Sequence, residues 1–185
     1  MLARVLRSLA AAPLLMIALA GATAAETDCS KPPAELGRFE GGSGKEAPAT
    51  PFLVGDSERT LADFRGKALV VNLWATWCAP CVTEMPALNR LSEAVAADGI
   101  AVLPLSADRE GAPIIEKFYA LNGIGHLPVM VDRMGKVARA LAVPGLPTTV
   151  LYDREGREAG RVVGTAEWDA PEAVRFLRAC LASPA

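Results

Sequence analysis

Histidine and cysteine are scarce in this chain. Its 185 residues include one histidine, His126, and four cysteines. A structural zinc site needs four nitrogen or sulfur ligands. Only two of the cysteines lie close together, since Cys29 and Cys180 are isolated, so the ligand shortage argues against zinc. Four cysteines in this length do not suggest a disulfide-stapled scaffold either, but they are compatible with one active pair plus two others.

The chain also has no large excess of charge of either sign. Nineteen lysines and arginines are set against 21 aspartates and glutamates, which gives a formal net charge of -2. This balance does not favour binding to nucleic acid or to a membrane through a polybasic surface. Half of the residues are hydrophobic, so a sizeable core is available, and the length is that of one domain with a short N-terminal extension.

The N-terminus combines a positive start with an apolar run. Arg4 and Arg7 precede an uncharged stretch over residues 8–25, with an Ala-x-Ala sequence at residues 22–24. This pattern predicts a secretory signal peptide over residues 1–25. An uncleaved membrane anchor is the alternative, because the run reaches the ~17 residues that a span needs. In both cases we expect a periplasmic protein, either soluble after cleavage or anchored to the inner membrane.

The two close cysteines, Cys78 and Cys81, lie where an apolar strand is expected to become a helix. Residues 68–74 are almost continuously apolar, as in a strand covered on both faces. If Cys78 opens the helix, Cys81 follows about one turn later on the same side. A helix N-terminus stabilises a thiolate, which predicts a lowered pKa for Cys78 and makes it the attacking sulfur. The arrangement indicates a thiol–disulfide redox site, with a purely structural disulfide as the alternative.

Hydrophobic patterning predicts an α/β order for the rest of the chain. Residues 26–50 are rich in Pro, Gly and Ser and are expected to form a loosely packed arm, with one short helix near residues 33–39. The compact domain is expected over residues 51–185, beginning with a small hairpin at residues 52–61. Parallel crossovers then precede an antiparallel hairpin. The predicted strands are 68–74, 100–105, 127–131, 148–152 and 158–163, and the predicted helices are 79–97, 112–121, 135–141 and 169–181.

Two motifs make the chain similar to the thioredoxin superfamily. Residues 74–81 (Trp-Ala-Thr-Trp-Cys-Ala-Pro-Cys) resemble its active-site motif, and residues 145–148 (Gly-Leu-Pro-Thr) resemble its loop with a cis proline opposite the CxxC. The hairpin, the inserted segment 127–141 and the sequences at 81–86 and 164–168 resemble the extracytoplasmic TlpA/ResA/CcmG-like branch, with TlpA-type proteins nearest in pattern. The resemblance implies a thioredoxin fold: a central mixed β-sheet flanked by helices, with an N-terminal β-hairpin extension and a βα insertion.

The resemblance implies roles for individual residues. Cys78 would be the nucleophile and Cys81 the resolving thiol. Glu84 matches a carboxylate that lies close to the cysteine pair in ResA-like proteins, and one helical turn beyond Cys81 it is near enough to affect proton transfer. The alternative for Glu84 is a solvated acid favoured by the helix dipole. Pro147, if cis, would place the Leu146 backbone beside Cys78, where an extended substrate segment could pair with it.

Three further residues near the motif have expected roles. Trp77 is expected to shield Cys78 or to contact partners, and Trp74 to pack in the core. Asn72 stands where cytoplasmic thioredoxins have a buried aspartate, so the proton-shuttle role of that aspartate cannot be transferred. Asn72 is expected to be a hydrogen-bonding core residue, and His126 a surface residue.

The resemblance also implies a second disulfide. TlpA has one between its N-terminal arm and its final hairpin; Cys29 matches the arm side, but the hairpin position is Arg157 here. Cys180 on the last helix is the remaining candidate, and in an oxidising compartment a Cys29–Cys180 bond would pin the arm to the domain. The bond requires Cα atoms within about 7 Å. Otherwise both would be free or intermolecular thiols.

We therefore expect a periplasmic thiol–disulfide oxidoreductase that reduces disulfides in specific partner proteins, without metal or other cofactor. No histidine lies between the cysteines, which argues against a strong oxidant. The resemblance implies a membrane thiol transporter as electron donor, and as client a copper-site assembly protein of cytochrome oxidase or an apocytochrome c. The alternative is a copper chaperone whose CxxC binds Cu(I). A peroxidase is disfavoured, because peroxidatic cysteines of that branch have no CxxC partner.

Overall fold

The apolar strand before the cysteines lies in the middle of the sheet. In the computed structural model, which describes residues 28–181, every residue of β4 (Ala68–Trp74) is buried. The strand pairs with parallel β5 (Ile100–Ser106) on one side and with antiparallel β7 (Thr148–Tyr152) on the other. Burial on both faces explains why nearly every position in it is apolar.

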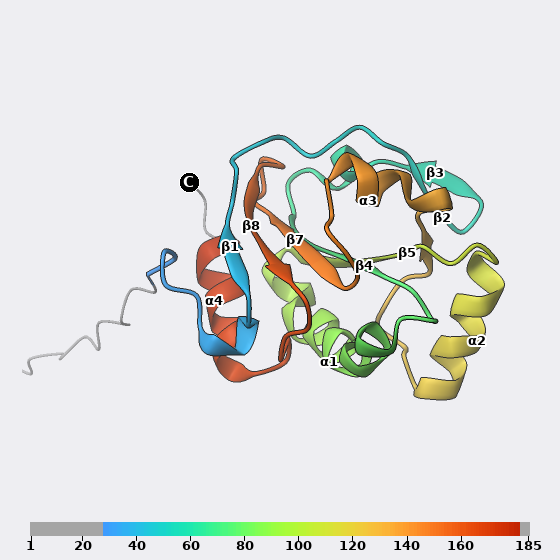
Figure 1. Cartoon of the computed structure of the whole chain (residues 1–185). Coiled ribbons are helices and arrows are strands. Elements are labelled where there is room, and N and C mark those ends of the chain that lie inside the picture. Colours follow the sequence, from blue (N-terminus) through green and yellow to red (C-terminus); the bar gives the residue numbers. More distant parts are fainter. Residues whose placement is uncertain (1–27, 182–185) are drawn as a thin grey trace, which may run out of the picture.

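Eight strands form one mixed sheet in the order β1-β8-β7-β4-β5-β6-β2-β3 (Figure 1). Strands β4, β5 and β6 are parallel neighbours, and all other pairs are antiparallel. This confirms the predicted α/β class with a mixed sheet. The remaining strands are β1 (Phe39–Gly41), β2 (Phe52–Val54), β3 (Ser57–Arg59), β6 (Met130–Val131) and β8 (Glu158–Val163).

Helices cover both faces of the sheet (Figure 1). One face packs against α1 (Ala79–Val95), α2 (Ala112–Asn122) and α4 (Pro171–Leu181), and the other against the short α3 (Lys136–Ala140). The α1 residues at helical spacing are fully buried, as predicted: Met85, Leu88, Leu91 and Val95. Four single 3-10 turns complete the described structure: η1 (Ala34–Leu36), η2 (Leu61–Phe64), η3 (Ala96–Asp98) and η4 (Arg133–Gly135).

The N-terminal arm packs against the domain. Strand β1 pairs with β8 at the edge of the sheet, and Leu36 in η1 is fully buried. Cys29 and Cys180 are joined by a disulfide, with their Cα atoms 5.6 Å apart. The expectation of a loosely packed arm is therefore wrong for residues 34–41, because edge pairing and core packing order them despite their composition. The short helix expected near residues 33–39 is the single turn η1.

Two predicted strands differ from the structure. The second strand of the first hairpin ends at Arg59 rather than at residue 61, because Thr60 and Asp63 form a capping box that starts η2. Strand β6 is shorter than the predicted 127–131. The side-chain oxygen of Asn89 accepts the backbone N–H of His126 at 2.8 Å, which holds the approach to β6 against α1 rather than along β5.

The predicted signal peptide or anchor at residues 1–25 lies outside the described residues. Within residues 28–181, no helix has both the length and the apolar character needed to cross a membrane.

Candidate active site

Cys78 lies at the junction of β4 and α1, as the sequence predicts. It is the N-cap of α1, and its Sγ accepts the backbone N–H of Cys81 at 3.4 Å. The two cysteines are joined by a disulfide, with Cα atoms 5.2 Å apart. Cys78 is 7% exposed and Cys81 is fully buried, so Cys78 is the sulfur that an incoming group can reach. After reduction, the free N–H groups at the helix start are placed to stabilise a Cys78 thiolate.

The two neighbouring tryptophans have opposite environments. Trp77, immediately before Cys78, is 69% exposed, whereas Trp74 is fully buried. The Trp74 ring stacks on Tyr119 with centroids 6.0 Å apart. This confirms the core role predicted for Trp74 and leaves a large aromatic surface beside the disulfide at Trp77.

The predicted proline loop lies opposite the end of β4. The peptide between Leu146 and Pro147 is cis. The next residue, Thr148, pairs with Leu73 near the end of β4, so the register brings Pro147 to the strand end from which the CxxC continues. The backbone N–H and carbonyl of Leu146 make no hydrogen bond within residues 28–181 and are available to a ligand.

Glu84 is buried, contrary to the alternative of a solvated first-turn acid. Its side chain is 3% exposed and lies one turn beyond Cys81. One carboxylate oxygen accepts from Asn72 Nδ2 at 2.9 Å, and the other accepts from Trp168 Nε1 at 3.0 Å and from the Ala166 N–H at 3.3 Å. Burial raises the pKa of Glu84, and the hydrogen bonds from these three donors oppose that rise without cancelling it.

Asn72 connects Glu84 to the strand that follows the proline loop. Its Nδ2 also donates to Thr149 Oγ1 at 2.9 Å. Asn72 is fully buried, which confirms its expected place as a hydrogen-bonding core residue. Its Oδ1 is buried without a hydrogen-bond partner in the described part of the chain. β4, the strand after Pro147 and Glu84 of α1 thus share one buried hydrogen-bond network.

The sequence prediction missed a second buried carboxylate near the site. Asp108, 3% exposed, accepts hydrogen bonds from the backbone N–H and the hydroxyl of Thr76, at 2.9 and 2.8 Å. It also accepts from the Ser106 hydroxyl at 2.7 Å. Thr76 lies two residues before Cys78, so Asp108 fixes the entry to the CxxC. Its position just after a parallel strand, at the sheet edge where the CxxC begins, is a signal that could have identified it.

An open groove begins at Trp77. Its volume is about 1130 Å³, and its walls come from the hairpin of β2 and β3, Trp77, residues 107–113, Val131 and residues 133–135. The exposed side chain of Met134 lies in the same groove, and Arg109 and Arg133 are among the charged residues that line it. A partner protein that reaches Cys78 past Trp77 would meet this surface.

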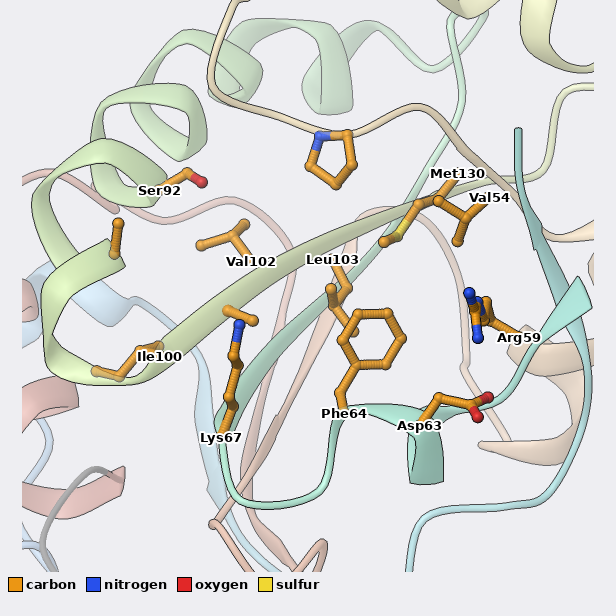
Figure 2. Close-up of a pocket in the computed structure, with 13 residues that line it drawn as sticks. Val54, Arg59, Asp63, Phe64, Lys67, Ser92, Ile100, Val102, Leu103 and Met130 are labelled. Carbon is orange, nitrogen blue, oxygen red and sulfur yellow. The ribbon is translucent and has the colours of Figure 1, made fainter. Parts of the chain in front are cut away.

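Another hollow, of about 590 Å³, is not part of this site (Figure 2). It lies along the first four residues of β5, with Arg59, Asp63 and Lys67 around it. The start of β5 is paired with the start of β4, whereas the CxxC follows the end of β4. No cysteine or histidine is among the residues that line this hollow.

The remaining candidate residues lie apart from the CxxC. The Cys29–Cys180 disulfide joins the arm to α4. His126 is on the surface, as predicted, with its Nε2 3.4 Å from a carboxylate oxygen of Glu93. Within residues 28–181, no group of three or more His, Cys, Asp or Glu side chains is arranged to hold a metal ion.

Comparisons with known proteins agree with this site. Residues 44–157, more than half of the chain, match the model of the AhpC/TSA family. The thiol-disulfide oxidoreductase ResA of Geobacillus thermodenitrificans is 36% identical over 120 residues, covering 63% of this chain and 68% of the relative. The thiol:disulfide interchange protein DsbE of Pseudomonas fluorescens is 32% identical over 126 residues, covering 67% of this chain and 68% of the relative.

Solved structures are similar over a larger part of the chain. A structure described as a DsbE-type thiol:disulfide interchange protein from Chlorobium tepidum superposes with a TM-score of 0.66 at 26% identity, covering 77% of this chain and 98% of the other. A DsbF homologue from Corynebacterium diphtheriae gives a TM-score of 0.59 at 26% identity, with 74% and 91% covered.

Proposed function

The chain belongs to the AhpC/TSA family of the thioredoxin superfamily and is a thiol-disulfide oxidoreductase, and we propose that it acts as a reductant of disulfides in specific partner proteins. The observation that carries this proposal is the pair Cys78–Cys81 at the start of α1, with one reachable and one buried sulfur. That asymmetry separates attack on a partner from resolution of the mixed disulfide.

The reaction proceeds by two disulfide exchanges. The Cys78 thiolate attacks one sulfur of a partner disulfide, forming a mixed disulfide and releasing the partner's other sulfur as a thiolate. Cys81 then loses its proton and attacks Cys78 Sγ, which releases the second partner sulfur and leaves the Cys78–Cys81 disulfide. Two electrons pass from the protein dithiol to the partner disulfide. The partner leaves as a dithiol after its two thiolates take up protons.

Glu84 is proposed as the proton acceptor for Cys81. Cys81 is fully buried and cannot give its proton directly to solvent. Glu84 is the buried carboxylate one helical turn away, and its raised pKa brings it closer to the thiol in proton affinity than an exposed glutamate would be. A carboxylate in this position takes the Cys81 proton in the second exchange and later returns it to solvent.

Partner segments are proposed to bind at Trp77 and at the proline loop. The free N–H and carbonyl of Leu146 would pair with an extended backbone segment of the partner. Trp77, immediately before Cys78 in sequence, adds exposed aromatic surface. Together they would hold a partner disulfide beside Cys78.

We place this reaction in the periplasm, on the strength of the signal-like residues 1–25. The resemblance to the TlpA/ResA/CcmG-like branch supports a copper-site assembly protein or an apocytochrome c as the client. It also supports a membrane thiol transporter as the source of electrons that reduces Cys78–Cys81 again.

A redox titration of residues 26–185 with glutathione tests the direction of electron flow. Differential alkylation and peptide mass would report each cysteine separately. We expect Cys78–Cys81 to equilibrate at about -270 to -200 mV, the range of reducing thioredoxin-like proteins. A value near about -120 mV would make the protein an oxidant. Stoichiometric tight binding of Cu(I) by the reduced pair, dependent on His126, would favour the copper chaperone instead.

A further inference from the structure

Trp168 is buried against the carboxylate that the proposed reaction uses. The indole is fully buried, and its Nε1 donates to Glu84 Oε2 at 3.0 Å. It comes from the loop between β8 and α4, more than 80 residues after Glu84 in sequence. The backbone N–H of Ala166 in the same loop donates to the same oxygen at 3.3 Å. One loop therefore supplies both donors to one side of the carboxylate.

We propose that Trp168 is a positioning residue, whose indole N–H holds the Glu84 carboxylate in place to receive the proton of Cys81. The proposal rests on the proposed role of Glu84 in the second exchange. Trp168 acts through Glu84 rather than on the reacting sulfurs. The indole is rigid and fully buried, so it can fix one oxygen of the carboxylate while the other remains free to change partners.

The loop that carries Trp168 is held at two points. The Gly164 N–H donates to the Pro147 carbonyl at 3.0 Å, which ties the loop to the proline loop. The Glu167 N–H donates to the Glu35 carbonyl at 2.9 Å, which ties it to the N-terminal arm. The arm is in turn fixed by the disulfide to α4. The loop that carries Trp168 is therefore tied both to the proline loop and to the N-terminal arm.

Asn72 completes the arrangement on the other side of Glu84. With Glu84 ionised, the Asn72 amide N–H donates to the carboxylate and the amide oxygen is left without a partner among residues 28–181. If the amide turns over, its oxygen can accept from a protonated Glu84, and the Thr149 hydroxyl can donate to the same oxygen. Asn72 can thus hydrogen-bond to both protonation states, while Trp168 donates to Oε2 in either.

A groove of about 760 Å³ leads from Glu84 to the surface and gives the proton a route to solvent. The charged groups that line it with Glu84 are the carboxylates of Glu35, Glu167 and Asp169, and Asp169 is paired with Arg90 at 2.6 Å. Asn72 and Thr149, which face Glu84 from the sheet, are neutral. Burial raises the pKa of Glu84 and the Trp168 hydrogen bond lowers it, so loss of that bond should raise this pKa further.

The chain offers a matched control for Trp168. Trp74 is also fully buried, but its Nε1 has no hydrogen-bond partner in the described residues. Trp168→Phe and Trp74→Phe remove the same atoms from two equally buried sites. Only the first removes a donated hydrogen bond.

The test follows the two exchanges separately in the full mature chain. Reduced protein, with the Cys29–Cys180 bond intact, is mixed with one equivalent of dithiodipyridine. Attack by Cys78 releases one thiopyridone, and attack by Cys81 releases the second, so absorbance records two steps. We expect the second step in wild type to slow toward low pH as Glu84 becomes protonated. Trp168→Phe should shift this fall in rate at low pH, the acid limb of the profile, to higher pH. At a given pH within the acid limb, the variant should slow the second step at least about ten-fold, the effect of losing a hydrogen bond to a charged group. Trp74→Phe should follow the wild-type profile.

Glu84→Gln distinguishes the role of Glu84 from that of Trp168. If Glu84→Gln leaves the acid limb unchanged, the proposed role of Glu84 fails. If Glu84→Gln removes the limb but Trp168→Phe does not move it, the positioning role of Trp168 fails and that of Glu84 stands. Equal effects of Trp168→Phe and Trp74→Phe would also overturn the proposal, because they would point to lost packing alone.

A measurement without substitutions covers the case in which Trp168→Phe does not fold. The chain has three tryptophans, so the indole N–H signals of the reduced protein can be resolved by ¹⁵N NMR. The Trp168 signal should titrate at the midpoint of the kinetic limb, and the Trp74 signal should not titrate with it. A Trp168 signal that stays constant across that pH range would overturn the proposal.

Discussion

Removing the Cys29–Cys180 disulfide should cost the domain about 3–5 kcal/mol of its free energy of unfolding. The change is the double substitution Cys29→Ala and Cys180→Ala, which leaves the active pair in place. The bond joins residues 151 apart in sequence, so it closes most of the described chain into one loop. The chain-entropy relation gives about 5 kcal/mol for a loop of this size at 25 °C, and native disulfides typically contribute somewhat less. The active disulfide, with a separation of 3, constrains the unfolded chain far less.

Urea unfolding at equilibrium measures this loss, with Cys78–Cys81 oxidised in both proteins. The midpoint should fall and the m-value should rise, because an unfolded chain without the long cross-link exposes more surface. A matched single variant, Cys180→Ala, should lose nearly as much as the double variant. A loss below about 1 kcal/mol with an unchanged m-value would contradict this prediction. It would mean that the bond restrains only the arm and not the unfolded chain as a whole.

Three further predictions concern stability. Leu36→Ala should cost about 2–5 kcal/mol in urea unfolding, because the side chain is fully buried, and should speed amide exchange in β1. Asp108→Ala should cost about 3 kcal/mol, since it leaves the N–H and hydroxyl of Thr76 without their acceptor; an unchanged urea midpoint would contradict this. For Glu158, burial raises the pKa, but hydrogen bonds from Arg161 and Ser43 outweigh this and leave the pKa below its ordinary value. Its ionised form therefore stabilises the fold above the unfolded pKa, and Glu158→Gln should flatten the loss of stability as pH falls below about 5.

The elements that follow from a local pattern in the sequence could be predicted. β4 and α1 follow from a continuous apolar run and from apolar residues at helical spacing, and the structure has both. The CxxC at their junction follows from the same two patterns. The motif around Pro147 was identifiable because its residues are adjacent in sequence. These features depend on contacts within a few residues or on one side of one element.

The features that were missed depend on distant contacts. β1 contains three residues in a Gly-rich segment, and its strand form comes from pairing with β8 more than 100 residues later. A role for Glu84 near the cysteine pair was predicted, but its burial depends on donors from β4 and from the loop at Trp168, which no local pattern joins. β6 is short because Asn89 holds the preceding segment. In each case a tertiary hydrogen bond or strand pair overrides the local preference.

The two disulfides differ in the end of a helix at which one of their sulfurs lies. Cys78 is at the N-terminal end of α1, where the helix dipole and free N–H groups stabilise a thiolate. Cys180 is in the last turn of α4, where the negative end of the dipole disfavours one. Disulfide exchange needs a stable thiolate both to attack and to leave. One fold can therefore hold an exchanging bond, Cys78–Cys81, at the start of one helix and a persistent bond, Cys29–Cys180, at the end of another. The persistent bond keeps the arm against the Trp168 loop.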